Sequence, residues 1–140
     1  MGGPFGAPVR IRQDAWTLSG PDPWHPTLLW YARAVKQLKT VTDVADPRGW
    51  PYLARIHGAS EQPGTWPPGV DDWNTCQHGS WFFLPWHRMY LHYFESIVRD
   101  VIQSLGGPVD WALPFWDYSE DAARSATLAL PPAFVATTWP

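Results

Sequence analysis

The sequence predicts a mainly helical fold. Two segments, residues 26–40 and 50–57, repeat apolar side chains at helical spacing, and a longer one follows from Pro85 to Gly106. A single stretch, Val9-Arg-Ile-Arg12, alternates apolar and charged side chains, as a short N-terminal edge strand does. Eleven tryptophans and sixteen prolines are both more than ordinary usage, which indicates large buried side chains and long, stiffened loops between helices.

The first two helices are bounded by start and stop signals. Pro26, after Asp22-Pro23, starts the helix over residues 26–40, and His25 just before it is interpreted as a capping or surface residue. In the second, Trp50 and Leu53 share a face with His57, and Gly58 ends the helix. Residues 59–75 are rich in Pro, Gly, Asp and Trp and are expected to form a long surface loop.

The third helix is the best defined, with Pro85 in its first turn and Gly106-Gly107 at its end. His92 is five positions after His87, about 140° of rotation away from it, so it lies on the other face of the helix and is interpreted as a solvated histidine. A turn over residues 113–118 and a proline-broken tail follow. The predicted core-facing stripe consists of His87, Leu91, Phe94, Val98, Val101 and Leu105.

Composition excludes several classes of protein. A chain of 140 residues fits one domain or a piece of one, and a net charge of −3 provides no basic surface for nucleic acid. The uncharged runs are too short and too interrupted by proline to span a bilayer, and the N-terminus lacks a signal-peptide core. We therefore expect a cytoplasmic protein by default, with export alongside a partner as the alternative. One cysteine allows no internal disulfide.

Three histidines are candidate metal ligands. His57 lies at the end of one predicted helix, His78 in a loop, and His87 at the start of the next helix. Three neutral imidazoles can hold copper, zinc or iron and leave a coordination position open for O₂ or substrate. Cys76, two positions before His78, is either a small buried residue or a group that ligates the metal or modifies that imidazole.

Three further charged residues have open interpretations. Arg88 and Glu95 share nearly one helical face, which is compatible with a weak surface pair or with a role in orienting a ligand histidine. Asp117 lies among aromatic residues and is either a turn or cap residue or a buried partner of Arg88. The sequence contains no phosphate loop, nucleophile elbow or His-Glu-x-x-His motif, so we predict no catalytic residue beyond the metal ligands.

Taken together, these residues resemble the first copper-binding region of the tyrosinase family of type-3 copper proteins, which includes catechol and polyphenol oxidases. The resemblance covers roughly residues 50–118. It is carried by four motifs: Ile56-His57-Gly58, Cys76-x-His78, Phe83-x-x-Trp86-His87-Arg88-x-Tyr90-Leu91-x-x-x-Glu95, and Pro114-Phe-Trp-Asp117.

The resemblance implies roles for individual residues. His57, His78 and His87 would bind the copper ion called copper A, and Phe83 would pack against the site. Cys76 matches the cysteine that some members link to the second ligand histidine, here His78, through a thioether bond. Arg88, Glu95 and Asp117 would then lie around the ligands.

The histidine count limits what the resemblance implies. A complete site holds two copper ions on six histidines, whereas this chain has five, of which His25 and His92 are interpreted as peripheral. It also lacks a His-x-x-x-His pair. Residues 1–140 therefore resemble the copper A half of a type-3 copper four-helix bundle, with one copper ion expected on this chain.

The implied activity is a copper oxidoreductase or monooxygenase that oxidises phenols or o-diphenols to o-quinones with O₂. The chain alone is expected to be inactive, so a copper B half chain, or self-association through an exposed apolar helix face, is the expected partner. Two alternatives stay open: a non-catalytic mononuclear copper-binding fragment, and an O₂-binding, haemocyanin-like protein.

Overall fold

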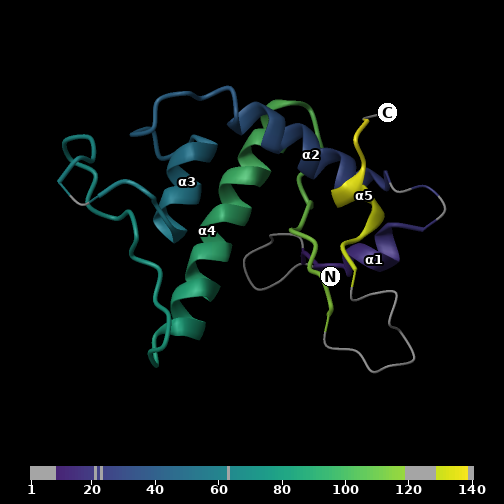
Figure 1. The fold of residues 1–140 in the computed structure, drawn as a ribbon. Helices are drawn as coiled ribbons and strands as arrows, with labels where there is room; N and C mark the ends of the chain where they lie inside the picture. The colour runs from purple at the N-terminus through teal and green to yellow at the C-terminus, as the bar shows by residue number, and fades with distance from the viewer. Residues whose placement is uncertain (1–8, 21, 23, 63, 119–128, 139–140) are drawn as a thin grey trace. The chain divides into compact units, whose positions relative to one another are not determined.

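The computed structural model describes residues 9–20, 22, 24–62, 64–118 and 129–138, which are mainly helical, as predicted (Figure 1). The chain divides into two compact units, residues 34–101 and residues 1–33 with 102–140. Among the described residues, no helix is both long enough and apolar enough to cross a membrane. The five helices of the described part are α1 (Ala15–Leu18), α2 (Pro26–Leu38), α3 (Trp50–His57), α4 (Phe83–Ser104) and α5 (Pro132–Val135).

The three predicted helices are confirmed as α2, α3 and α4. α2 and α3 begin at the predicted residues, and Gly58 follows the last residue of α3. α4 begins two residues before Pro85. It ends where Gly106 adopts a φ of 81° and the Gly107 N–H donates to the Ile102 carbonyl, a conformation that favours glycine.

The predicted strand over residues 9–12 is wrong. Instead, Asp14 forms an isolated parallel bridge with Phe115, where the Ala15 N–H donates to the Phe115 carbonyl at 2.7 Å. The extended segment stops at Asp14 because its carboxylate accepts backbone N–H groups of the first turn of α1 and so starts a helix. The segment over residues 113–118, predicted as a turn, has no regular secondary structure apart from this bridge.

The unit made of residues 1–33 and 102–140 has a small apolar core. Ala15 and Leu18 of α1 and Leu28 of α2 are buried together, and Ala133 of α5 packs against them. The indole N–H of Trp111 donates to a carbonyl of α2 at 3.0 Å. These contacts explain why α1 and α5, four residues each, form although neither is long enough to be stable alone.

The unit of residues 34–101 contains α3 and the first part of α4, which lie side by side (Figure 1). The Tyr90 hydroxyl donates to the Leu53 carbonyl at 2.8 Å, and the rings of Trp50 and Phe94 meet edge to face. Of the predicted stripe on α4, Phe94 and Val98 are buried. Leu91 and Leu105, which were also predicted to face the core, are 39% and 42% exposed.

Candidate metal centre

Three histidines converge in the unit of residues 34–101. The ring centroids of His57, His78 and His87 are 5.5–5.7 Å apart, so the imidazoles occupy the corners of a nearly equilateral triangle. One ligand atom of each, together with the Cys76 sulfur, lies within 4.8 Å of all the others. The structure therefore brings together all three predicted ligands.

Each imidazole comes from a different local structure. His57 is the last residue of α3, His78 lies in the loop before α4, and His87 lies in the second turn of α4. The His87 Nδ1 is 2.7 Å from the Phe83 carbonyl, a hydrogen bond in which Nδ1–H must be the donor. The neutral ring then presents Nε2 as a lone-pair donor, which is the orientation that a metal ligand needs.

Cys76 lies between two of these imidazoles. Its sulfur is 3.2 Å from His87 Nε2 and 3.6 Å from His78 Nε2. Burial raises the pKa of the Cys76 thiol, which disfavours the free thiolate. The thiol is thus close enough to take part in the site, as one of its two interpretations requires.

Aromatic rings form one side of the site. The ring of Phe83 is 4.3 Å from that of His87 and 5.8 Å from that of His78, centroid to centroid. Trp86 packs against His87 at 4.9 Å and reaches His57 at 6.4 Å. His57 and His78 themselves are exposed, so the opposite side of the triangle is open to solvent.

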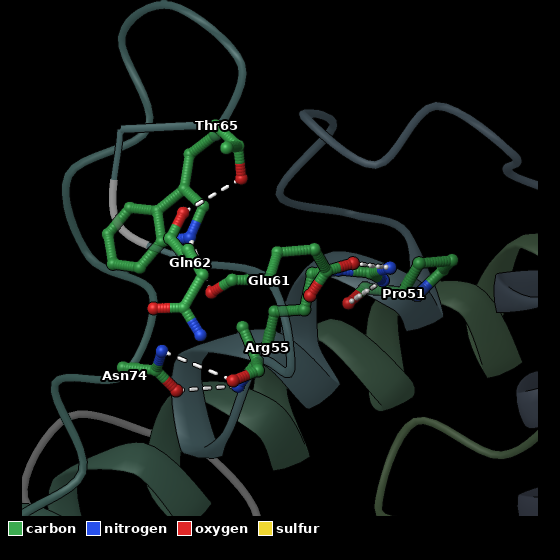
Figure 2. Close-up of polar contacts among 8 residues, drawn as sticks. Pro51, Arg55, Glu61, Gln62, Thr65 and Asn74 are labelled. Atoms are coloured by element: carbon green, nitrogen blue, oxygen red, sulfur yellow. Dashed lines mark hydrogen bonds and ion pairs between the residues drawn. The ribbon is translucent and has the colours of Figure 1, made fainter.

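The loop that carries His78 is fastened to α3. The Tyr52 hydroxyl lies 2.6 and 2.7 Å from the two carboxylate oxygens of Asp72, and burial, reinforced by this carboxylate, raises the pKa of Tyr52 to about 12. Arg55 donates to Glu61 at 2.6 Å (Figure 2). The Arg55 guanidinium also lies over the ring of Trp73. The hydrogen bond from Arg55 lowers the pKa of Glu61.

The other predicted site residues are placed as follows. Arg88 is exposed, and Glu95 is buried and accepts from Arg99 at 2.7 Å. Asp117 belongs to the other unit, where its N–H donates to Asp14. Their predicted roles around the ligands stay predictions.

The two remaining histidines follow the prediction. His25 accepts the Thr27 N–H on Nδ1 at 3.2 Å and so caps the start of α2. His92 lies on an exposed side of α4.

Sequence reasoning assigned no role to Trp86, Tyr90 or Asn74, although all three support the site. The first two belong to the quoted motif around His87, and their spacing from it places them one turn or less away. Asn74 could have been noticed as an asparagine, a residue that tolerates a left-handed backbone, just before Cys76 and His78.

The donor set fits a first-row transition metal such as copper. Imidazole nitrogens bind such ions at about 2.0–2.1 Å, which requires the nitrogens to lie about 4 Å apart or less. The separations here are within 4.8 Å, so small movements of the side chains would complete the geometry. An open side and neutral ligands also suit an ion that must bind a further molecule.

Comparison with known proteins identifies the class. The family model of the common central domain of tyrosinase matches residues 47–138, which include every residue of the triangle. The chain is similar to the tyrosinase HcTyr1 of Hahella sp. (strain CCB-MM4), with 43% identity over 94% of this chain and 32% of that protein.

Plant proteins are more distant relatives. Polyphenol oxidase A1 of Vicia faba, a chloroplastic protein, is 33% identical over 82% of this chain and 17% of its own length. The chloroplastic (+)-larreatricin hydroxylase of Larrea tridentata is 34% identical over 63% of this chain and 14% of its own length. The chain belongs to the tyrosinase family, and it spans about a third or less of the length of these relatives.

Proposed function

We propose that this chain binds one copper ion through His57, His78 and His87 and supplies the copper A half of a phenol-oxidising type-3 site. The observation that carries the proposal is the triangle of imidazoles, with His87 oriented by the Phe83 carbonyl. Residues 1–140 then act as one copper-binding domain, which needs a copper B half for full activity.

The bound copper would supply redox chemistry and polarisation of a coordinated oxygen. The residues of this chain have simpler tasks. The Phe83 carbonyl holds the proton of His87 on Nδ1, and the rings of Phe83 and Trp86 keep water from one side. The exposed edges of His57 and His78 leave the opposite side open for a flat phenolic ring.

The substrate class follows from the family. HcTyr1 is named a tyrosinase and the Vicia faba relative a polyphenol oxidase. We therefore propose that the completed site oxidises phenols or o-diphenols to o-quinones, with O₂ as the electron acceptor. Each half-site would then contribute three histidines, so that six histidines hold a pair of copper ions.

An exposed apolar surface beside the site supports the need for a partner. Trp81 is 98% exposed, and Leu84 and Met89 are also largely exposed. Monomeric proteins seldom leave large contiguous apolar patches uncovered, so this surface is suited to contact another protein segment. We propose that a copper B half, or a second copy of this chain, covers it.

The test combines copper titration with an activity assay. The chain is titrated with Cu(II) and followed by electron paramagnetic resonance, where one ion bound by three nitrogens is expected. His87→Ala should abolish this signal, and o-diphenol oxidation should appear only when a copper B half is added. If copper binds but no pairing restores oxidation, the chain is a non-catalytic mononuclear protein. Reversible O₂ binding without oxidation would indicate a carrier, and either result would refute the oxidase proposal.

A further inference from the structure

Asn74, in the loop before His78, has an unusual backbone conformation. Its φ is 56°, and within the described part of the chain it is the one residue other than glycine with a positive φ. Asparagine enters this left-handed region more readily than most residues, yet the conformation still has an energetic cost. Such a backbone persists where the surrounding contacts hold it in place.

The contacts that hold Asn74 are made to the end of α3. Its side-chain oxygen accepts the Ala59 N–H at 2.5 Å, and its side-chain nitrogen donates to the Ala59 carbonyl at 3.3 Å (Figure 2). Its own backbone N–H donates to the Arg55 carbonyl at 2.9 Å. We call this set of Arg55, Ala59 and Asn74 the Asn74 clamp.

The Asn74 clamp joins the two segments that carry two of the ligands. Arg55 and Ala59 lie two residues before and two residues after His57, whereas Asn74 lies four residues before His78. The clamp therefore fixes the direction in which the chain leaves His57 and the point from which it approaches His78. His87 is held separately, by its bond to Phe83.

Other contacts of this loop act farther from the ligands. The Tyr52–Asp72 and Arg55–Glu61 bonds fasten the loop to the body of α3, and Thr65 bonds to Gln62 inside the loop. Of the described residues between 59 and 78, Asn74 is the last that bonds to α3 or its exit. Only three residues of chain then separate the clamp from His78.

We propose that Asn74 is a positioning residue of the metal centre, which holds His57 and His78 at the separation that one ion requires. This inference rests on the proposed copper site. Loss of a group that orients metal ligands typically weakens metal affinity about 10- to 100-fold. An effect of that size is expected here, although Asn74 touches no ligand atom.

Three variants separate the carboxamide from the backbone conformation. Asn74→Gly keeps access to positive φ but removes the side-chain bonds, and should weaken Cu(II) binding at least about tenfold. Asn74→Asp keeps the acceptor for the Ala59 N–H and should recover part of that loss. Thr65→Ala removes a hydrogen bond of the same loop, so it serves as the matched control and should bind copper as the unmodified chain does.

The readouts are Cu(II) affinity, the paramagnetic resonance spectrum at saturating copper, and urea unfolding of the metal-free chain. An altered spectrum for Asn74→Gly, with little change in the urea midpoint, supports positioning. Unchanged affinity and spectrum in both Asn74 variants would overturn the inference. So would a normal spectrum combined with a parallel loss of stability, because that indicates a purely structural role.

Two further outcomes are also decisive. If Asn74→Gly does not fold, Asn74→Asp decides alone: a weakened, spectrally altered site supports the inference, and wild-type binding overturns it. If the unmodified chain shows no three-nitrogen copper signal, the proposed function itself fails, which is distinct from failure of the clamp.

Discussion

Val98→Ala tests whether the core of α4 and the proposed metal centre are energetically separate. Val98 is fully buried, and it lies eleven residues after His87, about 16 Å along the helix. The substitution removes two carbon atoms, worth about 0.8 kcal/mol each in transfer free energy. The cavity left behind adds a further penalty, so we expect a loss of about 2–3 kcal/mol in the free energy of unfolding.

The assay is urea unfolding followed by tryptophan fluorescence, with copper affinity measured on the folded variant. With an m value of about 1–3 kcal/mol per molar urea, the midpoint should fall by roughly 0.7–3 M. Copper affinity of the folded chain should be unchanged, since no ligand or ligand contact is altered. Ser96→Ala, on the same helix, is the control, and its effect should stay within about 0.5 kcal/mol.

His87→Ala should show the opposite pattern. His87 is only partly buried, so its removal should cost little stability in the metal-free chain, yet it should abolish copper binding. The reasoning is refuted if Val98→Ala costs less than about 1 kcal/mol, or if it weakens copper binding as strongly as it weakens folding. The first result would mean that burial of Val98 contributes less to stability than its exposure indicates, and the second that the site and the core form one cooperative element.

Three other properties are expected. The pKa of Tyr52 is raised to about 12, so the stability it contributes is complete below about pH 10 and is lost as the pH rises through about 12. The free energy of unfolding of the Tyr52→Phe variant should therefore differ least from that of the unmodified chain above about pH 12. In the copper-loaded chain under O₂, which accepts the two hydrogens removed, peptide mapping should find Cys76 joined to His78. The chain should also self-associate with rising concentration in sedimentation, and Trp81→Ser should reduce this association.

Each expectation has a contradicting result. Tyr118→Phe, which alters an exposed tyrosine, should leave alkaline stability unchanged, and an equal effect in both variants would contradict the role of Tyr52. An alkylatable Cys76 thiol after copper loading would contradict the thioether bond. A monodisperse monomer at all concentrations would contradict association, and Val135→Ser is the control for an exposed apolar side chain on α5.

The helices and the ligand triangle could be predicted from the sequence because their signals are local. Pro26 and Gly58 mark helix boundaries, and three histidines in a recognisable pattern indicate one site. The prediction of a strand over residues 9–12 was wrong. Alternation of apolar and charged side chains over four residues does not reveal whether a partner strand exists. The exposure of Leu91 was also missed, since periodicity defines a helix face but not what covers it.

The hydrogen bonds that attach the loop before His78 to α3 could not be predicted from the sequence, for a different reason. Tyr52 and Asp72 are 20 residues apart, and Ala59 and Asn74 are 15 apart, with proline, glycine and tryptophan between them. No period relates such residues, so their pairing depends on the path of the whole loop. Polar contacts across irregular segments are therefore visible only in the folded chain, although they decide where His78 lies.

The position of the proposed metal centre follows from how unevenly α4 is covered. Phe94 and Val98, in the middle of the helix, are buried. The part that carries His87 is close in sequence to Trp81 and Leu84, whose side chains are exposed. Apolar burial therefore contributes little to the order of this end, and hydrogen bonds and aromatic contacts hold the imidazoles instead. A bound ion stabilises the state that binds it, by about 2.7 kcal/mol at a concentration 100 times its dissociation constant. Copper should thus add most of its stabilisation at the end of α4 where the apolar core supplies least.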